Sequence, residues 1–251
     1  MNADIAQNLI KELNQQFEDQ SAADVLRFFI KNYKDRLGFS TSLGAEDQVI
    51  TQIIAGIDPD IYMFTLDTGR MFPETYDLLD LTQQRYKVRI KAYFPDQKAV
   101  EEMVNSKGIN LFYKSVGNRK LCCQIRKIEP LKRALESVDF WISGLRREQS
   151  VTREDVSLIE WDELNNKIKI NPLINWNSED LWDYIRQNKI PYNPLHDQGF
   201  PSIGCQPCTR AVNPGEDSRS GRWWWEDQGH RECGLHMKES SGAGIIQVKK
   251  L

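Results

Sequence analysis

The stretch that determines the fold reads LGFSTSLGAEDQVITQIIAG over residues 37–56. Its first part, residues 37–43, predicts a strand. Residues 45–56 predict a helix, because apolar side chains recur on one face at helical spacing. Those side chains are Val49, Ile50, Ile53 and Ile54. A strand that leads directly into a helix is the repeating unit of α/β domains, in which helices flank a mostly parallel sheet.

The turn between this strand and this helix consists of small residues. Its candidate ligand-binding residues are Thr41, Ser42 and Gly44. A small-residue turn before a helix N-terminus presents backbone N–H groups to an anion. In open α/β sheets, ligands bind at the carboxyl ends of strands. The turn is neither a Walker A loop nor a dinucleotide-binding glycine motif, so its composition leaves phosphate binding and an ordinary tight turn as equal alternatives.

The rest of the chain continues the alternation. Further strands are predicted at 60–66, 87–94 and 139–144, with a short fifth at 170–173, and helices at 73–86, 97–106, 119–136 and 178–188. Residues 1–36 predict two amphipathic helices. Pro130 is expected to kink or divide its helix, and Ser178 is expected to cap the last one. This order indicates a parallel sheet with helices on both faces.

The pattern changes after residue 190. Residues 191–251 are rich in proline and glycine, contain three consecutive tryptophans and have few periodic signals. We therefore expect an α/β domain over residues 1–190, N-terminal helices included. A loop-rich C-terminal region over residues 191–251 is expected to lie over that same domain.

The composition is that of a soluble globular protein, with 40% hydrophobic and 27% charged residues. The formal net charge is −3, which is not the basic excess of a general nucleic-acid binder. No apolar run reaches the roughly 20 residues of a membrane helix, and the first residues lack the pattern of a secretory signal. We expect a cytoplasmic protein without nucleic-acid or membrane partners. The oligomeric state is left open, a homo-oligomer included.

Five cysteines need an explanation other than disulfides, which are rare in the cytoplasm. Cys122 and Cys123 are adjacent, and Cys205 and Cys208 are spaced C-x-x-C. Four thiolates in two close pairs match the ligation of zinc or of a 4Fe–4S cluster. Adjacent ligands are unusual for a zinc ribbon, whereas neighbouring cysteines can each reach a different iron of a cluster. The pattern therefore favours the cluster over zinc, with four metal-free cysteines as the remaining alternative.

The fifth cysteine, Cys233, lies in the segment ECGLH, three residues before His236. A lone cysteine in a polar, glycine-flanked segment is typical of a reactive thiol, and an incidental surface cysteine is the alternative. His236 is close enough in sequence to help the thiolate or to orient an anionic substrate. Basic residues accompany these motifs: Arg126, Lys127, Arg146, Arg147, Arg153, Arg219 and Arg222. Each of them, taken alone, is most simply a solvated surface residue.

The ordered set of motifs resembles the assimilatory adenylyl-sulfate (APS) and phosphoadenylyl-sulfate (PAPS) reductases. The matching pieces are SLGAEDQV, LDTGRMFPETY, KLCCQIRKIEPL, GLRREQSVTR, GCQPCTR, GEDSRSGRWWWE and ECGLH, over about residues 35–236. The resemblance implies an adenine-nucleotide α-hydrolase-like fold. It also implies the APS branch, because members with both cysteine pairs generally use APS. A PAPS reductase or a dual APS/PAPS reductase is the alternative, since some cluster-bearing members accept both.

The resemblance also implies roles at the matching positions. Cys233 is the implied nucleophile, and the implied 4Fe–4S ligands are Cys122, Cys123, Cys205 and Cys208. The implied substrate-binding residues are Thr41, Ser42 and Gly44 in the phosphate loop, Leu66 beside the adenine, Gly144 and Arg153 in the nucleotide site, and Lys127, Arg219, Arg222 and His236 at the phosphosulfate.

In the implied reaction, the Cys233 thiolate attacks the sulfur of APS, AMP leaves, and a cysteine S-sulfonate remains. Thioredoxin or glutaredoxin, as an external dithiol, would then release sulfite. Two other functions compete. A tRNA-thiolating nucleotide hydrolase would carry S-G-G-x-D-S where this chain has SLGAED. A nucleotide-binding iron–sulfur or zinc sensor without turnover would leave Cys233 unexplained.

Overall fold

The computed structural model describes residues 3–149, 153 and 155–226. Its centre is a six-stranded sheet in the order β3-β2-β1-β4-β6-β5. The strands are β1 (Leu37–Ser40), β2 (Tyr62–Leu66), β3 (Ile90–Tyr93), β4 (Phe140–Ile142), β5 (Ile159–Asp162) and β6 (Lys167–Ile170). Neighbouring strands are parallel, except that β5 runs antiparallel to β6. The predicted α/β fold with a mostly parallel sheet is confirmed.

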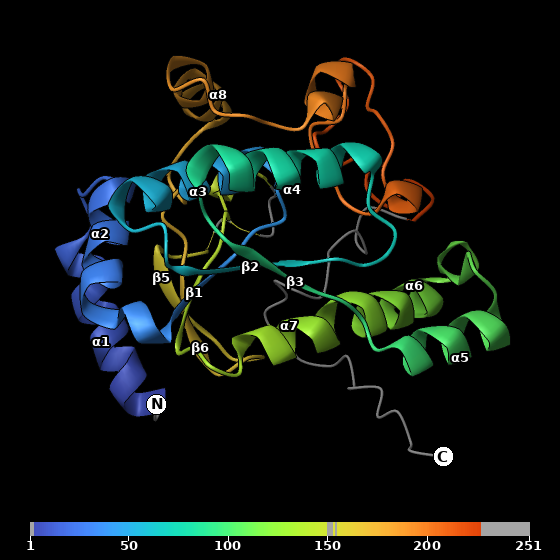
Figure 1. The fold of residues 1–251 in the computed structure, drawn as a ribbon, viewed down its shortest axis with the longest axis horizontal. Coiled ribbons are helices and arrows are strands. Elements are labelled where there is room, and N and C mark those ends of the chain that lie inside the picture. The colour runs from blue at the N-terminus through green and yellow to red at the C-terminus, as the bar shows by residue number, and fades with distance from the viewer. Residues whose placement is uncertain (1–2, 150–152, 154, 227–251) are drawn as a thin grey trace.

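Helices cover both faces of the sheet (Figure 1). One face packs against α1 (Ala3–Gln16), α2 (Ala22–Tyr33), α3 (Ala45–Ile57), α4 (Pro73–Tyr86) and α8 (Ser178–Gln187). The other face packs against α7 (Glu129–Leu135), and beyond α7 lie α6 (Val116–Cys123) and α5 (Gln97–Lys107). Among the described residues, no helix combines the length and the apolar character that a membrane crossing requires.

The core has two layers because side chains alternate across a strand. Phe39 of β1 packs in the layer that holds α2 and α3, whereas Phe64 of β2 and Trp141 of β4 pack under α7. All three side chains are buried. Burial of such a side chain contributes about 1.5–3 kcal/mol, so both faces of the sheet are stabilised by their helix layers.

The edge of the sheet differs from the sequence-based expectation. The strand predicted at residues 170–173 instead ends at Ile170, and it forms a hairpin with β5, which the sequence did not indicate. Lysines interrupt the apolar pattern of β6, so its sequence does not resemble that of a buried strand. The structure buries Lys169, with its ammonium 5.2 Å from the centre of the Trp141 ring and 3.4 Å from the Glu160 carboxylate.

The helix predicted at residues 119–136 is divided, as Pro130 implied. A π-helical turn over Gln124–Ile128 separates α6 from α7, and the Glu129 N–H donates to the Gln124 carbonyl. A proline cannot donate to the carbonyl four residues earlier, and its ring crowds that carbonyl. The wider turn just before Pro130 accommodates both effects.

The expected cap of the last helix is wrong by one residue. Asn177, not Ser178, is the N-cap of α8, and its side chain accepts a hydrogen bond from the Asp180 N–H at 2.8 Å. The Asp180 carboxylate in turn accepts from the Asn177 N–H at 3.4 Å, which completes a capping box. Asn and Ser are comparable caps, so the adjacent residues could not be ranked by type alone.

Asp47, the third residue of α3, holds the turn between β1 and α3. Its carboxylate accepts hydrogen bonds from the Ser42 backbone N–H at 2.6 Å and from the Ser42 hydroxyl at 2.7 Å. Leu43 within the turn has a φ of 62°, which an L-residue rarely adopts. Burial raises the pKa of the Asp47 carboxyl to about 7, although the bonds from Ser42 act in the opposite direction.

We expect the natural protein to lose stability as the pH rises through the pKa of Asp47, and we expect Asp47→Asn to remove this loss. The pKa of Asp47 rises from its ordinary 3.8 to about 7 on folding, so the unfolded chain releases this proton first as the pH increases. The free energy of unfolding of the natural protein should therefore fall relative to that of Asp47→Asn between about pH 4 and pH 7. Urea unfolding of both proteins across this range measures the difference, and a difference independent of pH would contradict the expectation.

Candidate functional site

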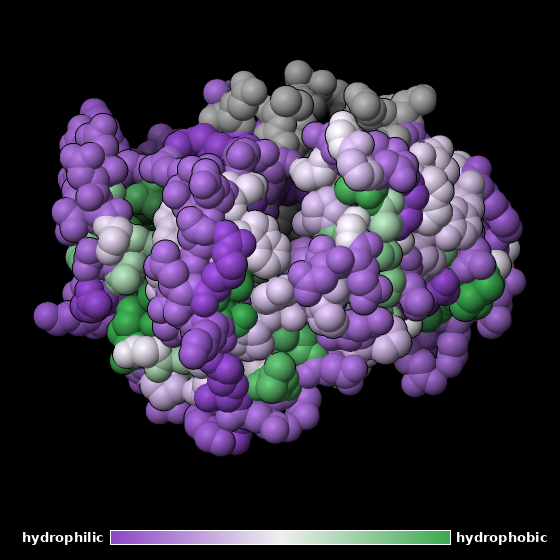
Figure 2. Space-filling view, turned by 90° about the horizontal axis from the view of Figure 1, so that it is seen from above, coloured by the Kyte–Doolittle hydropathy of each residue, from purple (hydrophilic) through white to green (hydrophobic). Residues whose placement is uncertain are grey.

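A cavity of about 330 Å³ opens at the carboxyl ends of β1, β2 and β4. The chain continues from β1 to β2 and β3 on one side of the sheet, whereas β4 lies on the other side of β1. The strand order therefore reverses between β1 and β4, which is where open α/β sheets leave a crevice for ligands. Seen from above, the molecule is mostly hydrophilic, with hydrophobic residues in separate patches (Figure 2).

Nine sequence-predicted substrate-binding residues line this cavity. They are Thr41, Ser42, Gly44, Leu66, Lys127, Gly144, Arg153, Arg219 and Arg222. The β1–α3 turn, the end of β2, the π-helical turn, the segment after β4 and the segment before the tryptophans each contribute some of them. The set combines a turn before a helix with four cations, which suits a phosphorylated ligand. His236 and Cys233 lie outside the described residues.

Two glycines allow polar side chains to form the cavity wall. A Cβ at Gly144 would overlap the Asp47 carboxylate, and a Cβ at Gly204 would overlap the Arg222 guanidinium. Gly144 follows β4 and Asp47 belongs to α3, so the first contact joins the two strand ends on either side of the crevice. The second contact joins Arg222 to the loop that carries Cys205.

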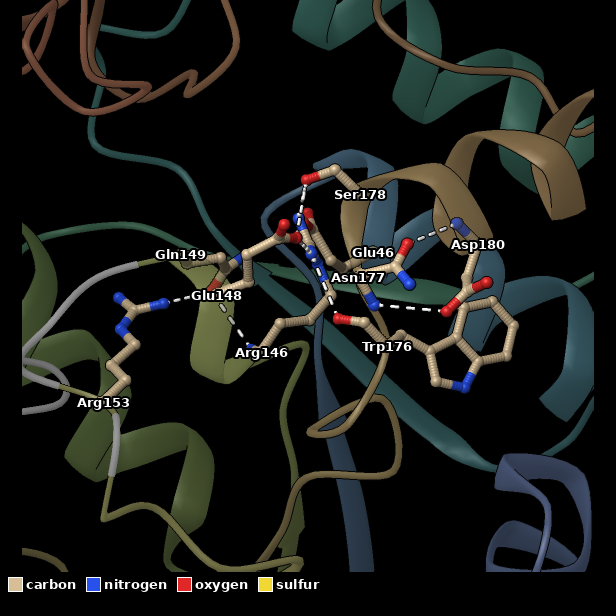
Figure 3. Close-up of polar contacts among 9 residues, drawn as sticks. All are labelled: Glu46, Arg146, Glu148, Gln149, Arg153, Trp176, Asn177, Ser178 and Asp180. Carbon is tan, nitrogen blue, oxygen red and sulfur yellow. Dashed lines mark hydrogen bonds and ion pairs between the residues drawn. The ribbon is translucent and has the colours of Figure 1, made fainter.

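Arg146 forms a second part of the wall (Figure 3). The sequence indicated it only as one of several basic residues, without a role in substrate binding. Its Nε lies 2.9 Å from the Glu46 carboxylate, and its Nη1 lies 2.9 Å from the Glu148 carboxylate. The Ser178 hydroxyl donates to Glu148 at 2.8 Å. Two carboxylates compensate the buried guanidinium, so Arg146 fixes the wall rather than adding positive charge to the cavity. Arg153 beside it donates to the Gln149 side chain.

His196 is another lining residue that the sequence analysis missed. It packs edge-on against Trp182, with ring centres 5.2 Å apart. Burial lowers its pKa, which favours the neutral imidazole. Neither ring nitrogen has a hydrogen-bond partner within the described part of the chain. A lone histidine in a short 3₁₀ helix, here Pro194–Gln198, carries no spacing signal, so only the cavity reveals it.

A second, smaller cavity brings together Cys122, Cys123, Cys205 and Cys208. The first two end α6, where the π-helical turn begins. The other two belong to a loop in which Gln206–Cys208 form a 3₁₀ turn. That loop is fastened to the segment after β2, because the Gln206 N–H donates to the Arg70 carbonyl at 2.8 Å. Thr68 Oγ1 also lies 3.3 Å from Cys205 Sγ. The loop and the helix end therefore face each other although Cys123 and Cys205 are 82 positions apart in the sequence.

Cations and apolar side chains complete the cysteine cavity: Arg70, Arg119, Arg126, Lys127, Phe112 and Pro207. Burial raises the pKa of Cys122, and it raises the pKa of Cys208 to about 12, while Lys127 lowers both. A buried thiolate thus needs compensating positive charge. Lys127 lines both cavities. No group of three or more His, Cys, Asp or Glu in residues 3–149, 153 and 155–226 is arranged around a single metal ion.

Known proteins share both the sequence and this architecture. Residues 36–211 match the family model of the phosphoadenosine phosphosulfate reductase domain. An adenosine 5′-phosphosulfate reductase from Allochromatium vinosum is 51% identical over 205 residues, which cover 82% of this chain and 80% of that protein. Another, from Sinorhizobium fredii strain NGR234, is 46% identical over 235 residues, or 94% of this chain and 93% of that protein.

Solved structures of other proteins share the fold of this chain. A phosphoadenylyl-sulfate reductase from Candida auris, solved as a phosphate complex, superposes with a TM-score of 0.71 at 31% identity. The match covers 82% of this chain and 97% of that one. An FMN adenylyltransferase from Candida glabrata has a TM-score of 0.53 at 15% identity over 86% of this chain and 77% of its own, which indicates a shared fold only. The chain belongs to the phosphoadenosine phosphosulfate reductase family, which its motifs predicted.

Proposed function

We propose that this protein is an adenylyl-sulfate reductase, which converts APS to sulfite and AMP with electrons from a dithiol protein. One observation carries the proposal: nine residues that the family motifs predicted to bind substrate line a single cavity at the switch point of the sheet. Relatives that are 46–51% identical and span most of the chain are named adenosine 5′-phosphosulfate reductase, which supports APS as the substrate.

The cavity offers a separate environment for each part of the nucleotide. Leu66 and Gly144 would contact the adenosine, and Thr41 and Ser42 lie in the turn before α3, where backbone N–H groups favour an anion. The cations Lys127, Arg219 and Arg222, together with His236, would hold the phosphosulfate. Positive charge there reduces the repulsion between an anionic substrate and a thiolate, and it stabilises the charge that develops on the leaving phosphate.

The chemical step is a displacement at sulfur. The Cys233 thiolate forms a bond to the sulfur of APS, and the bond between that sulfur and the bridging phosphate oxygen breaks, so AMP leaves with the electron pair. A dithiol such as thioredoxin or glutaredoxin then attacks Cys233 Sγ, which expels sulfite. Its second thiol resolves the mixed disulfide, and the donor ends as a disulfide, which accounts for the two electrons. This donor is kept reduced in the cytoplasm, where we expect the protein to act.

The cysteine cavity suits a 4Fe–4S cluster. Its four cysteines line one small cavity with several cations beside them, which matches the needs of a ligand set of four thiolates. Cys122, Cys123, Cys205 and Cys208 would be the ligands. When bound, such a cluster would supply a concentrated local charge next to Lys127. Because Lys127 lines both cavities, the charge of the cluster would influence the electrostatic potential at the phosphosulfate.

A PAPS or dual-specificity reductase is the alternative that a specific observation favours, because the solved Candida auris relative is a PAPS reductase. Steady-state kinetics with APS and with PAPS distinguish these possibilities. Residues on both sides of position 190 line both cavities. This supports the expectation that the C-terminal region from residue 191 belongs to the same domain as residues 1–190.

We expect Cys233→Ser to abolish sulfite formation without weakening AMP binding, because it removes only the attacking sulfur. Intact-mass analysis after incubation with APS and no reductant should detect one sulfo group on the natural protein and none on the variant. Reduced thioredoxin should remove the group. A variant that still gains it would contradict the assignment of the nucleophile.

We expect Cys208→Ser to lose bound iron and sulfide, because a hydroxyl is a poor replacement for one of four thiolates. Iron and acid-labile sulfide analysis, with the visible absorbance spectrum, measures this loss in anaerobically purified protein. Cys233→Ser is the matched control and should retain the iron. Stoichiometric zinc in place of iron in the natural protein would reject the cluster.

We expect Gly144→Ala to weaken AMP binding at least about tenfold, because the added methyl overlaps the Asp47 carboxylate and forces the cavity wall to move. Isothermal titration calorimetry measures the dissociation constant. Gly56→Ala is the matched control, since no atom lies within 4 Å of a Cβ at that position. Equal affinities of the two variants would remove Gly144 from the proposed site.

A further inference from the structure

Trp223 is buried and has a strained backbone conformation. Its side chain is buried in the apolar cluster that includes Cys208, and its backbone N–H donates to the Cys208 carbonyl at 3.2 Å. Its φ is 44°, which bulky residues rarely adopt. Such a conformation persists only where contacts with the surrounding structure hold it in place. The contacts of the indole are therefore the ones to consider.

Two arginines lie over the Trp223 ring. The guanidinium carbon of Arg119 is 4.7 Å from the ring centre, and that of Arg222 is 4.8 Å from it. Both distances are within the range of a cation–π contact. Arg119 lines the cysteine cavity, whereas Arg222 lines the nucleotide cavity. The indole therefore connects one cation from each cavity.

Glu226 compensates Arg119 in a buried, two-pronged ion pair. Arg119 Nε donates to one carboxylate oxygen at 3.0 Å, and Nη2 donates to the other at 2.8 Å. The two side chains are only 1% and 3% exposed. This geometry fixes the plane of the guanidinium, and it ties α6 to the segment that follows the tryptophans.

Arg222 is confined on its other sides as well. Its guanidinium fits against Gly204, where a Cβ would overlap it, and Nη1 donates to the Ser202 hydroxyl at 3.3 Å. The indole is thus one of the groups that confine the Arg222 side chain. The same indole contacts Arg119 of α6.

We propose that Arg119 and Glu226 are positioning residues, which act through Trp223 to hold Arg222 where it binds the phosphate end of the nucleotide. The inference rests on the proposed function, because it takes a phosphorylated adenosine as the ligand. Neither Arg119 nor Glu226 lines the nucleotide cavity. Their effect on the ligand is therefore indirect, and the contacts of Arg119 and Arg222 with the indole provide the route.

The test compares AMP with adenosine, which differ only in the phosphate. Glu226→Gln should weaken AMP binding about tenfold, because a displaced cation loses most of one charge-assisted hydrogen bond. Adenosine binding should not change. Arg119→Met should give the same result, although it changes the local charge in the opposite direction. If the two variants changed AMP affinity in opposite directions, the cause would be long-range electrostatics, and the positioning role would be overturned. Equal losses of affinity for AMP and adenosine would overturn it as well.

A double-mutant cycle locates the effect. Arg222→Ala should weaken AMP binding by itself, and Glu226→Gln added to it should have little further effect, because both act on the same contact. Additive losses would reject the pathway through Arg222. Glu216→Gln is the matched control: this glutamate pairs with Arg210 at 3.1 Å in the same region but is partly exposed, and its variant should bind AMP normally.

Two further measurements keep the outcome decisive. Trp223→Phe retains the ion pair and a smaller aromatic face, so it serves if Glu226→Gln does not fold, and it should lower AMP affinity selectively. A Trp223→Phe variant with unchanged AMP affinity would overturn the inference. Failure of the natural protein to bind AMP at all would instead reject the proposed function on which the inference rests.

Discussion

The contact between the β1–α3 turn and the end of β4 is the constraint on which the rest of the site depends. The Asp47 carboxylate is bonded to Ser42 within its own turn and lies directly against Gly144. Gly144 has no side chain to separate the turn from the end of β4. The neighbouring strands β1 and β4, whose following strands lie on opposite sides of the sheet, therefore share one wall of the cavity. The pairing of Arg146 with Glu46 extends that wall, and loops from distant parts of the sequence then face a single volume.

Local patterns predicted most of the fold because most elements are determined by local chemistry. The helix predicted at residues 73–86 has those bounds in the structure, since a proline suits the first turn. The hairpin of β5 and β6 was missed for the opposite reason. Lys169 is buried against Trp141 and beside Glu160, and neither is its neighbour in sequence.

The same distinction separates the predictable part of the site from the rest. Thr41 and Gly144 follow strands and Leu66 ends one, so the family motifs at these strand ends indicated a ligand-binding edge. Arg146 and Glu46 are 100 residues apart, and Arg119 and Glu226 are 107 residues apart. No periodicity or spacing signals such pairs, since each forms only when separate elements pack. His196 is hidden for the same reason.

The π-helical turn has a consequence for the angular phase of the helix that contains it. A regular α-helix advances by about 100° per residue, and a wider turn resets this advance. Residues before Gln124 and after Ile128 therefore need not follow one continuous stripe. The helix can direct Cys122 toward the cysteine cavity and still turn Leu131 and Leu135 toward the sheet. Deletion of a single residue from this turn would rotate the cysteines relative to the core while leaving every remaining side chain chemically intact.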